Sequence, residues 1–210
     1  MQMVPSLRQE GLMSRHNSPL SQAGYSLLEL IVSMVIIGGI TVPLSTFIIN
    51  GMKSYQFLQA QSDTSTELGS LSNRISRVVR GTTGIIDAQT NTLTIYAYFS
   101  PQDTVVKKVR YFISGSNLNI GVTPPTGIAP TFTYNASDEV IKTVRLDLVM
   151  GSNSLFTYYD DAGNQLTSGF QTSQIKQVGL YVAANGSTKL VTVPIAVQTR
   201  VTLRNFKTNL

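Results

Sequence analysis

Glu29 is the residue of this chain whose position most clearly suggests a chemical role. It stands directly before residues 30–49, a run of twenty residues without a charged side chain. A bilayer core of about 30 Å is spanned by roughly 20 apolar helical residues, so the run is long enough to cross a membrane. A charge within such a segment costs on the order of 2.5–3.5 kcal/mol on insertion scales. A carboxylate at this edge therefore predicts a function for Glu29 within the membrane.

The residues around Glu29 form a known pattern. Gly24-Tyr25-Ser26-Leu27-Leu28-Glu29, followed by the charge-free run, resembles the type III signal of bacterial type IV pilins and type II secretion pseudopilins. The resemblance implies that a prepilin peptidase cleaves between Gly24 and Tyr25 and that Tyr25 is then N-methylated. It also implies that Glu29, the fifth residue of the mature chain, acts in filament assembly. Tyr25 departs from the usual Phe or Met but keeps an aromatic ring, so we expect cleavage to occur.

Cleavage would create a partner for the carboxylate. The new α-amine of Tyr25 is largely protonated at neutral pH. In a low dielectric, an ammonium group close to a carboxylate offsets much of the desolvation cost of both. The Tyr25 amine and Glu29 of one helix lie about one turn apart, and the family's assembly model implies that the amine of an adjacent subunit reaches the same carboxylate.

Three residues weaken the helix inside the apolar run. Pro43 removes a backbone hydrogen bond, and the pair Gly38-Gly39 adds flexibility. Two interpretations remain open. One is a kinked membrane helix packed through small residues. The other, which the pilin resemblance favours, is local melting between Gly38 and Pro43 when the subunit passes from membrane to filament.

The composition excludes several classes of enzyme. The chain has no cysteine, and its only histidine, His16, lies in the predicted leader. The predicted mature chain therefore lacks the parts of a His-based triad, a cysteine nucleophile or an ordinary zinc site. We expect no enzymatic activity and no cofactor. A minor alternative is an anchored enzyme that uses only carboxylates, with Asp147 or Asp160 as candidates.

Other polar and aromatic groups favour structural roles. Asp160, Asp161 and Asn164 offer oxygen ligands, but calcium needs six to eight, and a hairpin turn fits the segment better. The only tight basic group lies at residues 107–110 and alternates with apolar residues like a solvated strand face, so nucleic acid is an unlikely partner. Most of seven aromatic residues are expected to fill a sheet core rather than to stack on DNA. They are Tyr96, Tyr98, Phe99, Tyr111, Phe112, Tyr158 and Tyr159.

The rest of the sequence predicts one very long helix followed by a β domain. Leu68, Leu71, Ile75 and Val78 recur at helical spacing, which predicts a helix from residue 26 to residue 80 with one buried stripe and with Gly81 as its C-cap. After residue 84, short runs rich in β-branched and aromatic residues predict strands. These runs are residues 92–99, 105–113, 141–150, 155–159, 165–167, 175–183, 190–193 and 197–203, with a loop at 121–130.

The predicted fold is therefore α+β and pilin-like, with the long helix packed on a mainly antiparallel sheet. We divide the chain into a cleaved leader (1–24), a transmembrane and assembly helix (25–53), an amphipathic half of the helix (54–81) and a β-rich domain (82–210). Arg8 and Arg15 precede the span, which favours an N-terminus in the cytoplasm. The ending Leu203-Arg204-Asn205 resembles the closing strand of minor pilins and J-type pseudopilins.

These resemblances imply a structural subunit, a minor pilin or pseudopilin, of a type IV pilus or a type II secretion-like filament. The implied partners are the prepilin peptidase, other pilin or pseudopilin subunits, the inner-membrane assembly platform and the lipid bilayer. The implied location is the bacterial inner membrane, as a single-pass precursor, and then an extracytoplasmic filament. The alternative is a single-span membrane-anchored binding or receptor protein with an exposed β domain.

Overall fold

The computed structural model describes residues 26–128, 131–186 and 193–204. The chain divides into two compact units, Met1–Asn50 and Gly51–Leu210, and each is described by itself. One long N-terminal helix and two antiparallel sheets make up these residues. The predicted α+β architecture with a long apolar helix is confirmed.

Helix α1 spans Leu27–Arg80, 54 residues, so both predicted ends are correct to within one residue. It begins where the Ser26 side chain accepts a hydrogen bond from the backbone N–H of Glu29 at 3.2 Å, as N-capping residues do. It ends where Gly81 donates to the carbonyls of Arg77 and Val78. Basic side chains in the last turn, next to the negative end of the helix dipole, also favour this end.

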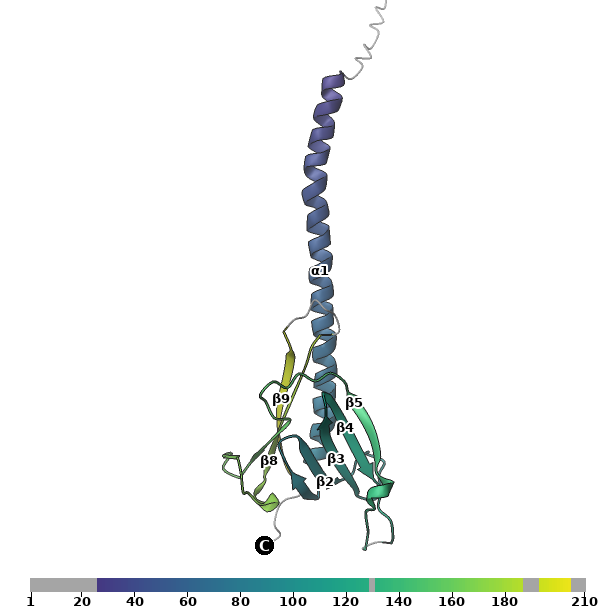
Figure 1. Cartoon of the computed structure of the whole chain (residues 1–210), viewed down its shortest axis with the longest axis vertical. Coiled ribbons are helices and arrows are strands. Elements are labelled where there is room, and N and C mark those ends of the chain that lie inside the picture. The colour runs from purple at the N-terminus through teal and green to yellow at the C-terminus, as the bar shows by residue number, and fades with distance from the viewer. Residues whose placement is uncertain (1–25, 129–130, 187–192, 205–210) are drawn as a thin grey trace, which may run out of the picture. The chain divides into compact units, whose positions relative to one another are not determined.

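The first sheet follows the helix as a simple meander. Every neighbouring pair is antiparallel, and the strand order is that of the sequence (Figure 1). Its strands are β1 (Gly84–Ala88), β2 (Thr92–Ala97), β3 (Lys107–Ser114), β4 (Asn117–Thr123) and β5 (Val140–Arg145).

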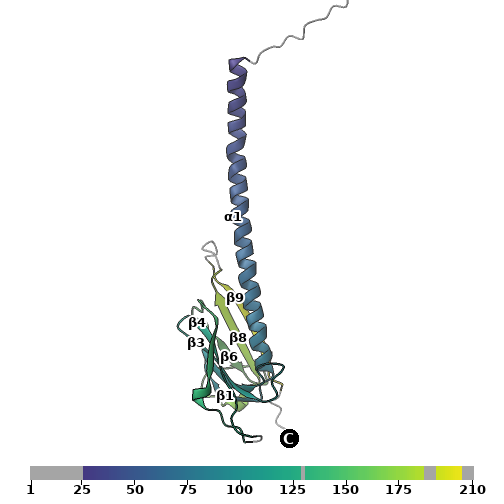
Figure 2. The same cartoon turned by 90° about the vertical axis from the view of Figure 1, so that its right-hand side faces the viewer.

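The second sheet has four antiparallel strands in the order β7-β6-β8-β9. Its long strands β8 and β9 run beside the last part of α1 (Figure 2). A bridge between Leu148 and Ala184 joins the segment after β5 to β8 and so links the two sheets. The strands are β6 (Phe156–Tyr159), β7 (Gln165–Leu166), β8 (Gln177–Ala184) and β9 (Ile195–Thr202), and two 3-10 turns are η1 (Ala136–Asp138) and η2 (Thr172–Gln174).

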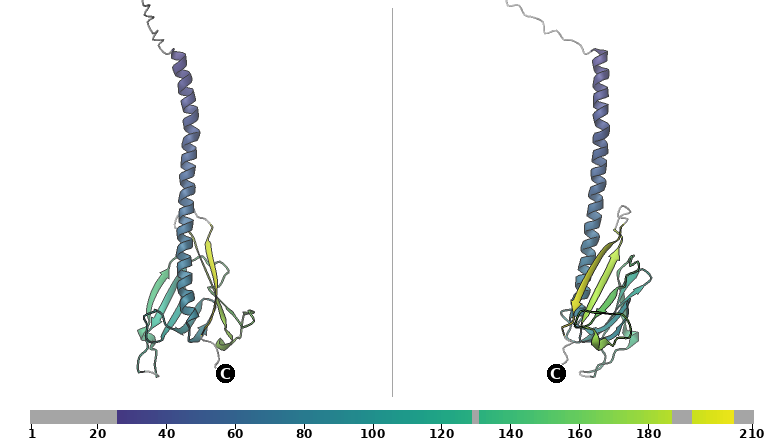
Figure 3. Two further views of the ribbon diagram at one scale, coloured as in Figure 1. Left: turned by 180° about the vertical axis from the view of Figure 1, so that it is seen from behind. Right: turned by 90° about the vertical axis from the view of Figure 1, so that its left-hand side faces the viewer.

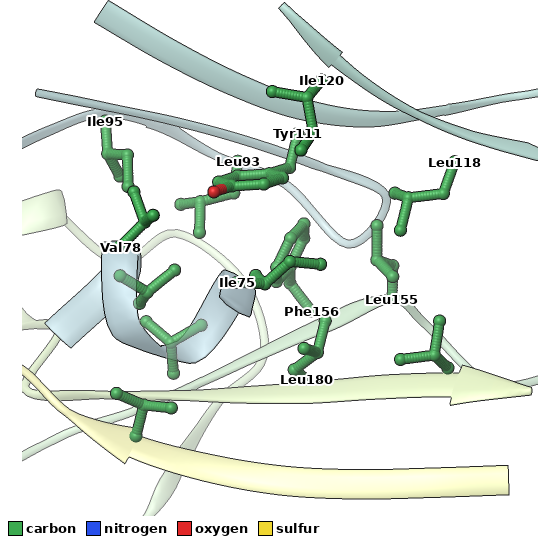
Figure 4. Packing of buried hydrophobic residues seen from close by; sticks show 14 of the residues in the cluster. Ile75, Val78, Leu93, Ile95, Tyr111, Leu118, Ile120, Leu155, Phe156 and Leu180 are labelled. Atoms are coloured by element: carbon green, nitrogen blue, oxygen red, sulfur yellow. The ribbon is translucent and has the colours of Figure 1, made fainter. Parts of the chain in front are cut away.

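The core lies where the last turns of α1 meet both sheets. The predicted stripe is buried, and Leu68 and Ile75 are at most 1% exposed. Figure 4 shows Ile75 and Val78 of the helix packed among side chains of both sheets. From the first sheet these are Leu93, Ile95, Tyr111, Leu118 and Ile120, and from the second sheet or the segment before it Leu155, Phe156 and Leu180.

Two polar contacts tie the helix to both sheets. Glu67 forms an ion pair with Arg145 at the end of β5, and Ser72 shares a 2.9 Å hydrogen bond with Thr199 of β9. Seen from behind, this part of α1 lies between β5 and β9 (Figure 3). A bulge in β5 supports the first contact: Arg145 pairs with Leu118, but Thr143 pairs with Asn119, so Val144 is the extra residue. The bulge places Arg145 on the helix side of the sheet.

Several strand predictions need correction. The expected single sheet is two sheets. The strand expected over 141–150 ends at Arg145, because the bulge precedes it and Asp147 has a positive φ of 56°. The loop expected from residue 121 begins later, because β4 runs to Thr123. Neither the short strand β1 nor β4 was predicted as a strand. Of the strand expected at 190–193, only Val193, which is not in a strand, lies within the described residues.

Tyr111→Phe is expected to leave the free energy of unfolding unchanged or to raise it by about 1 kcal/mol. The Tyr111 hydroxyl is buried and has no hydrogen-bond partner among the described residues, and an unsatisfied buried polar group costs about 1–3 kcal/mol. Burial raises the pKa of this hydroxyl, and Arg74 lowers it to a smaller extent. Denaturant unfolding of the full chain in detergent measures the change.

Tyr158→Phe is the matched control. The Tyr158 hydroxyl is also buried, but it donates a 2.7 Å hydrogen bond to the carbonyl of Gln89. Its loss should lower the unfolding free energy by about 1 kcal/mol. Equal losses in the two variants would show that Tyr111 has a partner in solution.

Gly121→Ala is expected to destabilise the first sheet by about 1–3 kcal/mol. A Cβ at Gly121 would meet Oε1 of Glu139 at 2.0 Å. That carboxylate cannot move freely, because it accepts two hydrogen bonds from Arg110 at 2.9 and 2.6 Å. Gly69→Ala, in open space on α1, should instead stabilise by up to about 1 kcal/mol. If the Glu139 contact is responsible, Gly121→Ala should cost far less in a Glu139→Ala background.

Candidate functional site

The described part of unit Met1–Asn50 is an uninterrupted helix, and Glu29 lies in its first turn. Both backbone polar groups of Glu29 bond to serine side chains. Its N–H donates to the hydroxyl oxygen of Ser26, and its carbonyl accepts a 2.7 Å hydrogen bond from the hydroxyl of Ser33. The positive end of the helix dipole favours a carboxylate in this turn. The structure therefore places one anionic group at the beginning of the apolar run.

The apolar side chains that follow Glu29 are exposed. No residue between positions 26 and 59 is buried, and Leu27, Ile37 and Phe47 are 79%, 64% and 76% exposed. Contiguous exposed apolar surface of this extent marks an interaction with protein or membrane. By length and composition, α1 is the one helix of the described residues that is able to cross a membrane.

Two threonine hydroxyls within the run form hydrogen bonds inside the helix. Thr41 donates to the carbonyl of Ile37 at 2.6 Å, and Thr46 donates to Val42 at 3.0 Å. Because each hydroxyl donates to a carbonyl of its own helix, neither hydroxyl needs a partner from the surroundings. Such satisfaction within one helix is what a lipid surrounding requires.

Pro43 leaves a backbone acceptor free. It has no N–H, so the carbonyl of Gly39, four residues earlier, lacks its usual donor. The α-helix nevertheless continues through Gly38, Gly39 and Pro43. A Cβ added at either glycine would meet nothing within 4 Å, so neither glycine is required by packing inside this chain. Their predicted role in helix flexibility stays a prediction.

Two of the predicted site residues, Gly24 and Tyr25, lie outside the described residues. The structure brings Glu29 and the apolar surface together on one helix, and it adds Ser26 and Ser33, which sequence reasoning missed. Ser26 was recognisable as a capping residue, since a serine three positions before an acidic residue is typical of a helix start.

The candidate calcium ligands form a turn. Asp160 accepts hydrogen bonds from the backbone and the side-chain amide of Asn164 at 2.8 and 3.0 Å, and these lower the pKa of its carboxyl. Gly163 has a φ of 85°, as the predicted turn requires. Within the part of the chain that the structure describes, Asp161 and Asp160 belong to no group of three or more metal-ligating side chains.

Five of the seven aromatic residues named above lie in strands of the two sheets, and Tyr98 and Phe99 follow β2. Tyr111 and Tyr158 are buried, and Tyr111 packs edge-on against Phe156 with ring centroids 6.5 Å apart. Tyr159 is buried as well, and the guanidinium carbon of Arg200 lies 3.6 Å from the centre of its ring. The basic group of β3 is also occupied, since Lys107 pairs with Asp103 at 2.7 Å.

An open groove of about 620 Å³ is a feature that the sequence did not reveal. It lies at the junction of the two sheets and includes Ser116, Asp147 and Asn185 in its lining. Asp147, a candidate of the enzyme alternative, has a positive φ, and its N–H contacts the side chain of Asn117 at 3.4 Å. Because the residues that line the groove come from three distant segments of the chain, no local sequence pattern predicts the groove.

The comparisons with known proteins add no family: neither the models of protein families nor the curated proteins gave a match.

Proposed function

We propose that this chain is a structural subunit, a minor pilin or pseudopilin, of a type IV pilus or a type II secretion-like filament. In this proposal the prepilin peptidase removes residues 1–24, Tyr25 is methylated, and the mature chain is anchored in the inner membrane before it enters a filament. The exposed apolar surface of α1, with Glu29 as the one charge at its beginning, is the observation that carries the proposal.

Three features support a role in assembly rather than turnover. The apolar residues of α1 before residue 60 are exposed in the described chain, so they need lipid or other helices around them. The fold combines one long helix with antiparallel sheets, as the family resemblance implies. The sequence offers no cysteine, and its one histidine precedes the expected cleavage site. In the filament, the helix would pack among neighbouring helices, and the β domain would face outward.

The intact mass and the N-terminal residue of the protein test the proposal. The protein is isolated from cells with and without active prepilin peptidase. We expect a chain that begins at Tyr25 and carries one additional methyl group, formed only when the peptidase is active. A chain that keeps residues 1–24, or one cut after residue 49, would contradict the proposal.

A membrane-anchored binding protein is the second candidate. The groove beside Asp147 and Asn185 favours it, because ligand pockets commonly measure about 300–1,000 Å³. This candidate has no use for a carboxylate at position 29 or for cleavage after Gly24. The same mass measurement separates the two: an uncleaved chain in the presence of the peptidase would favour the binding protein.

A further inference from the structure

A small hollow lies where the end of β1 and the turn after it meet the second sheet. It measures about 260 Å³, and strands β6 and β7 and the segment after β7 form its other walls. It shares no lining residue with the groove beside Asp147. We call it the β6–β7 hollow, and its lining includes Gln89, Thr90, Ser154, Gln165, Thr167 and Phe170.

Contacts between the two sheets hold the walls of the β6–β7 hollow in place. The N–H of Phe156 donates to the carbonyl of Thr90 at 2.8 Å, and the hydroxyl of Tyr158 donates to the carbonyl of Gln89 at 2.7 Å. Phe170 packs on Tyr158 with ring centroids 5.5 Å apart. The turn η2, which follows Phe170 directly, is closed by a capping box. The hollow is therefore preformed, and a ligand binds there at little cost in conformational entropy of the protein.

Four polar side chains of the lining have no partner in the protein. Within the part of the chain that the structure describes, the side chains of Thr90, Ser154, Gln165 and Thr167 make no hydrogen bond. Together they offer three hydroxyls and one primary amide, groups that both donate and accept. Single side chains of this kind are common on a protein surface. Their convergence on one preformed hollow is what indicates a binding site.

The chemistry of the lining selects the class of ligand. None of the described residues that line the hollow carries a charge, so nothing in it favours a phosphate, a carboxylate or a cation. The half-buried ring of Phe170 and the side chain of Leu166 add an apolar wall. A pyranose ring has the complementary chemistry, because its hydroxyls donate and accept while its C–H groups pack on the electron-rich face of an aromatic ring.

The size of the hollow limits how much of a ligand it holds. Pockets for drug-sized ligands measure about 300–1,000 Å³, and the β6–β7 hollow is slightly smaller. It therefore suits one ring of a sugar chain, with the rest of the chain outside.

We propose that the β6–β7 hollow binds one ring of a neutral oligosaccharide. Phe170 packs against one face of the sugar ring, and Gln165 and Thr167 form hydrogen bonds with its hydroxyls. This role does not depend on assembly into a filament, so the mass measurement that tests the proposed function leaves it unaffected.

The test uses the full chain in phosphatidylcholine nanodiscs, because detergents with sugar headgroups would compete for the site. Saturation-transfer difference NMR is recorded separately with cellotetraose, maltotetraose and N-acetylchitotetraose, and empty nanodiscs provide the blank. At least one of these sugars should receive saturation, strongest at the C–H protons of one ring, with a dissociation constant on the order of 1 mM. No transfer to any of the three at about ten times that concentration would overturn the proposal.

Gln165→Ala/Thr167→Ala removes two exposed side chains of the hollow that make no hydrogen bond within the described chain, so the fold should be unchanged. Loss of two hydrogen bonds to the sugar should weaken binding at least about tenfold. The matched control, Gln198→Ala/Thr202→Ala, removes the same two side chains from exposed positions of β9 outside the hollow. It should bind within about twofold of the unaltered protein.

Two results with these variants and probes would contradict the proposal. Equal weakening by the two double variants would show that the sugar contacts the surface without a specific site. Stronger transfer to a neutral peptide of alternating serine and threonine than to any of the sugars would overturn the proposal in favour of a protein partner.

Discussion

Glu29→Val is expected to leave membrane insertion intact and to lower incorporation into filaments about 100-fold. The substitution lengthens the apolar run by one β-branched residue, which lipid tolerates. It also removes the only anionic group beside the α-amine that cleavage would create at Tyr25. Breaking a buried ion pair by removing one partner costs about 3–5 kcal/mol, and about 3 kcal/mol corresponds to a factor of roughly 100. The measurement is the ratio of protein in sheared filaments to protein in the membrane fraction.

Asp63→Val is the control for this variant. It removes a carboxylate from an exposed position of the same helix, and Asp63 has no ion pair among the described residues. We expect normal incorporation. Incorporation of Glu29→Val at the level of the control would end the proposed role of Glu29, while peptidase-dependent cleavage of the same variant would still support the pilin class.

Leu68→Ala is expected to lower the free energy of unfolding of the β domain by about 2–5 kcal/mol. Leu68 is completely buried at the point where α1 meets the sheets. Truncation removes its contacts and leaves a cavity that the surrounding strands cannot easily fill. The chain has no tryptophan, so near-ultraviolet circular dichroism of the buried tyrosines, followed in denaturant, is a suitable measurement on the full chain.

Leu58→Ala makes the same chemical change on the same helix. Leu58 is 60% exposed, so a loss within about 0.5 kcal/mol is expected. A similar loss at both positions would mean that the helix does not pack on the sheets in solution as the structure has it.

The helix was predictable because its signals are strong and local. An apolar run and then a 3.6-residue stripe predict its length, and the basic last turn with Gly81 predicts its end. The strand pattern gave β2, β3, β6, β8 and β9 approximately, since alternating β-branched and aromatic residues are typical of half-buried strands. These elements depend on side chains close together in sequence.

The features that sequence reasoning missed depend on contacts between distant residues. Residues 121–123 carry turn-like composition, yet they are the end of β4, where the missing side chain of Gly121 leaves room for the Glu139 carboxylate that pairs with Arg110. The division into two sheets and the groove at their junction likewise arise from long-range pairing, such as Leu148 with Ala184. Of the candidate site, Glu29 and its apolar surface follow from the sequence. The β6–β7 hollow does not, because its lining comes from segments far apart in the chain.

The bulge at Val144 has a consequence for behaviour at high concentration. Among the described residues, strand β5 ends the first sheet and has one row of unpaired backbone groups, and Val140 and Ile141 are exposed along it. Such an edge is a template for aggregation unless something interrupts it. Here the bulge breaks the regular repeat, and the exposed Lys142 puts a charge in the middle of the strand. At high concentration, two copies of the domain are therefore less prone to pair through their β5 edges.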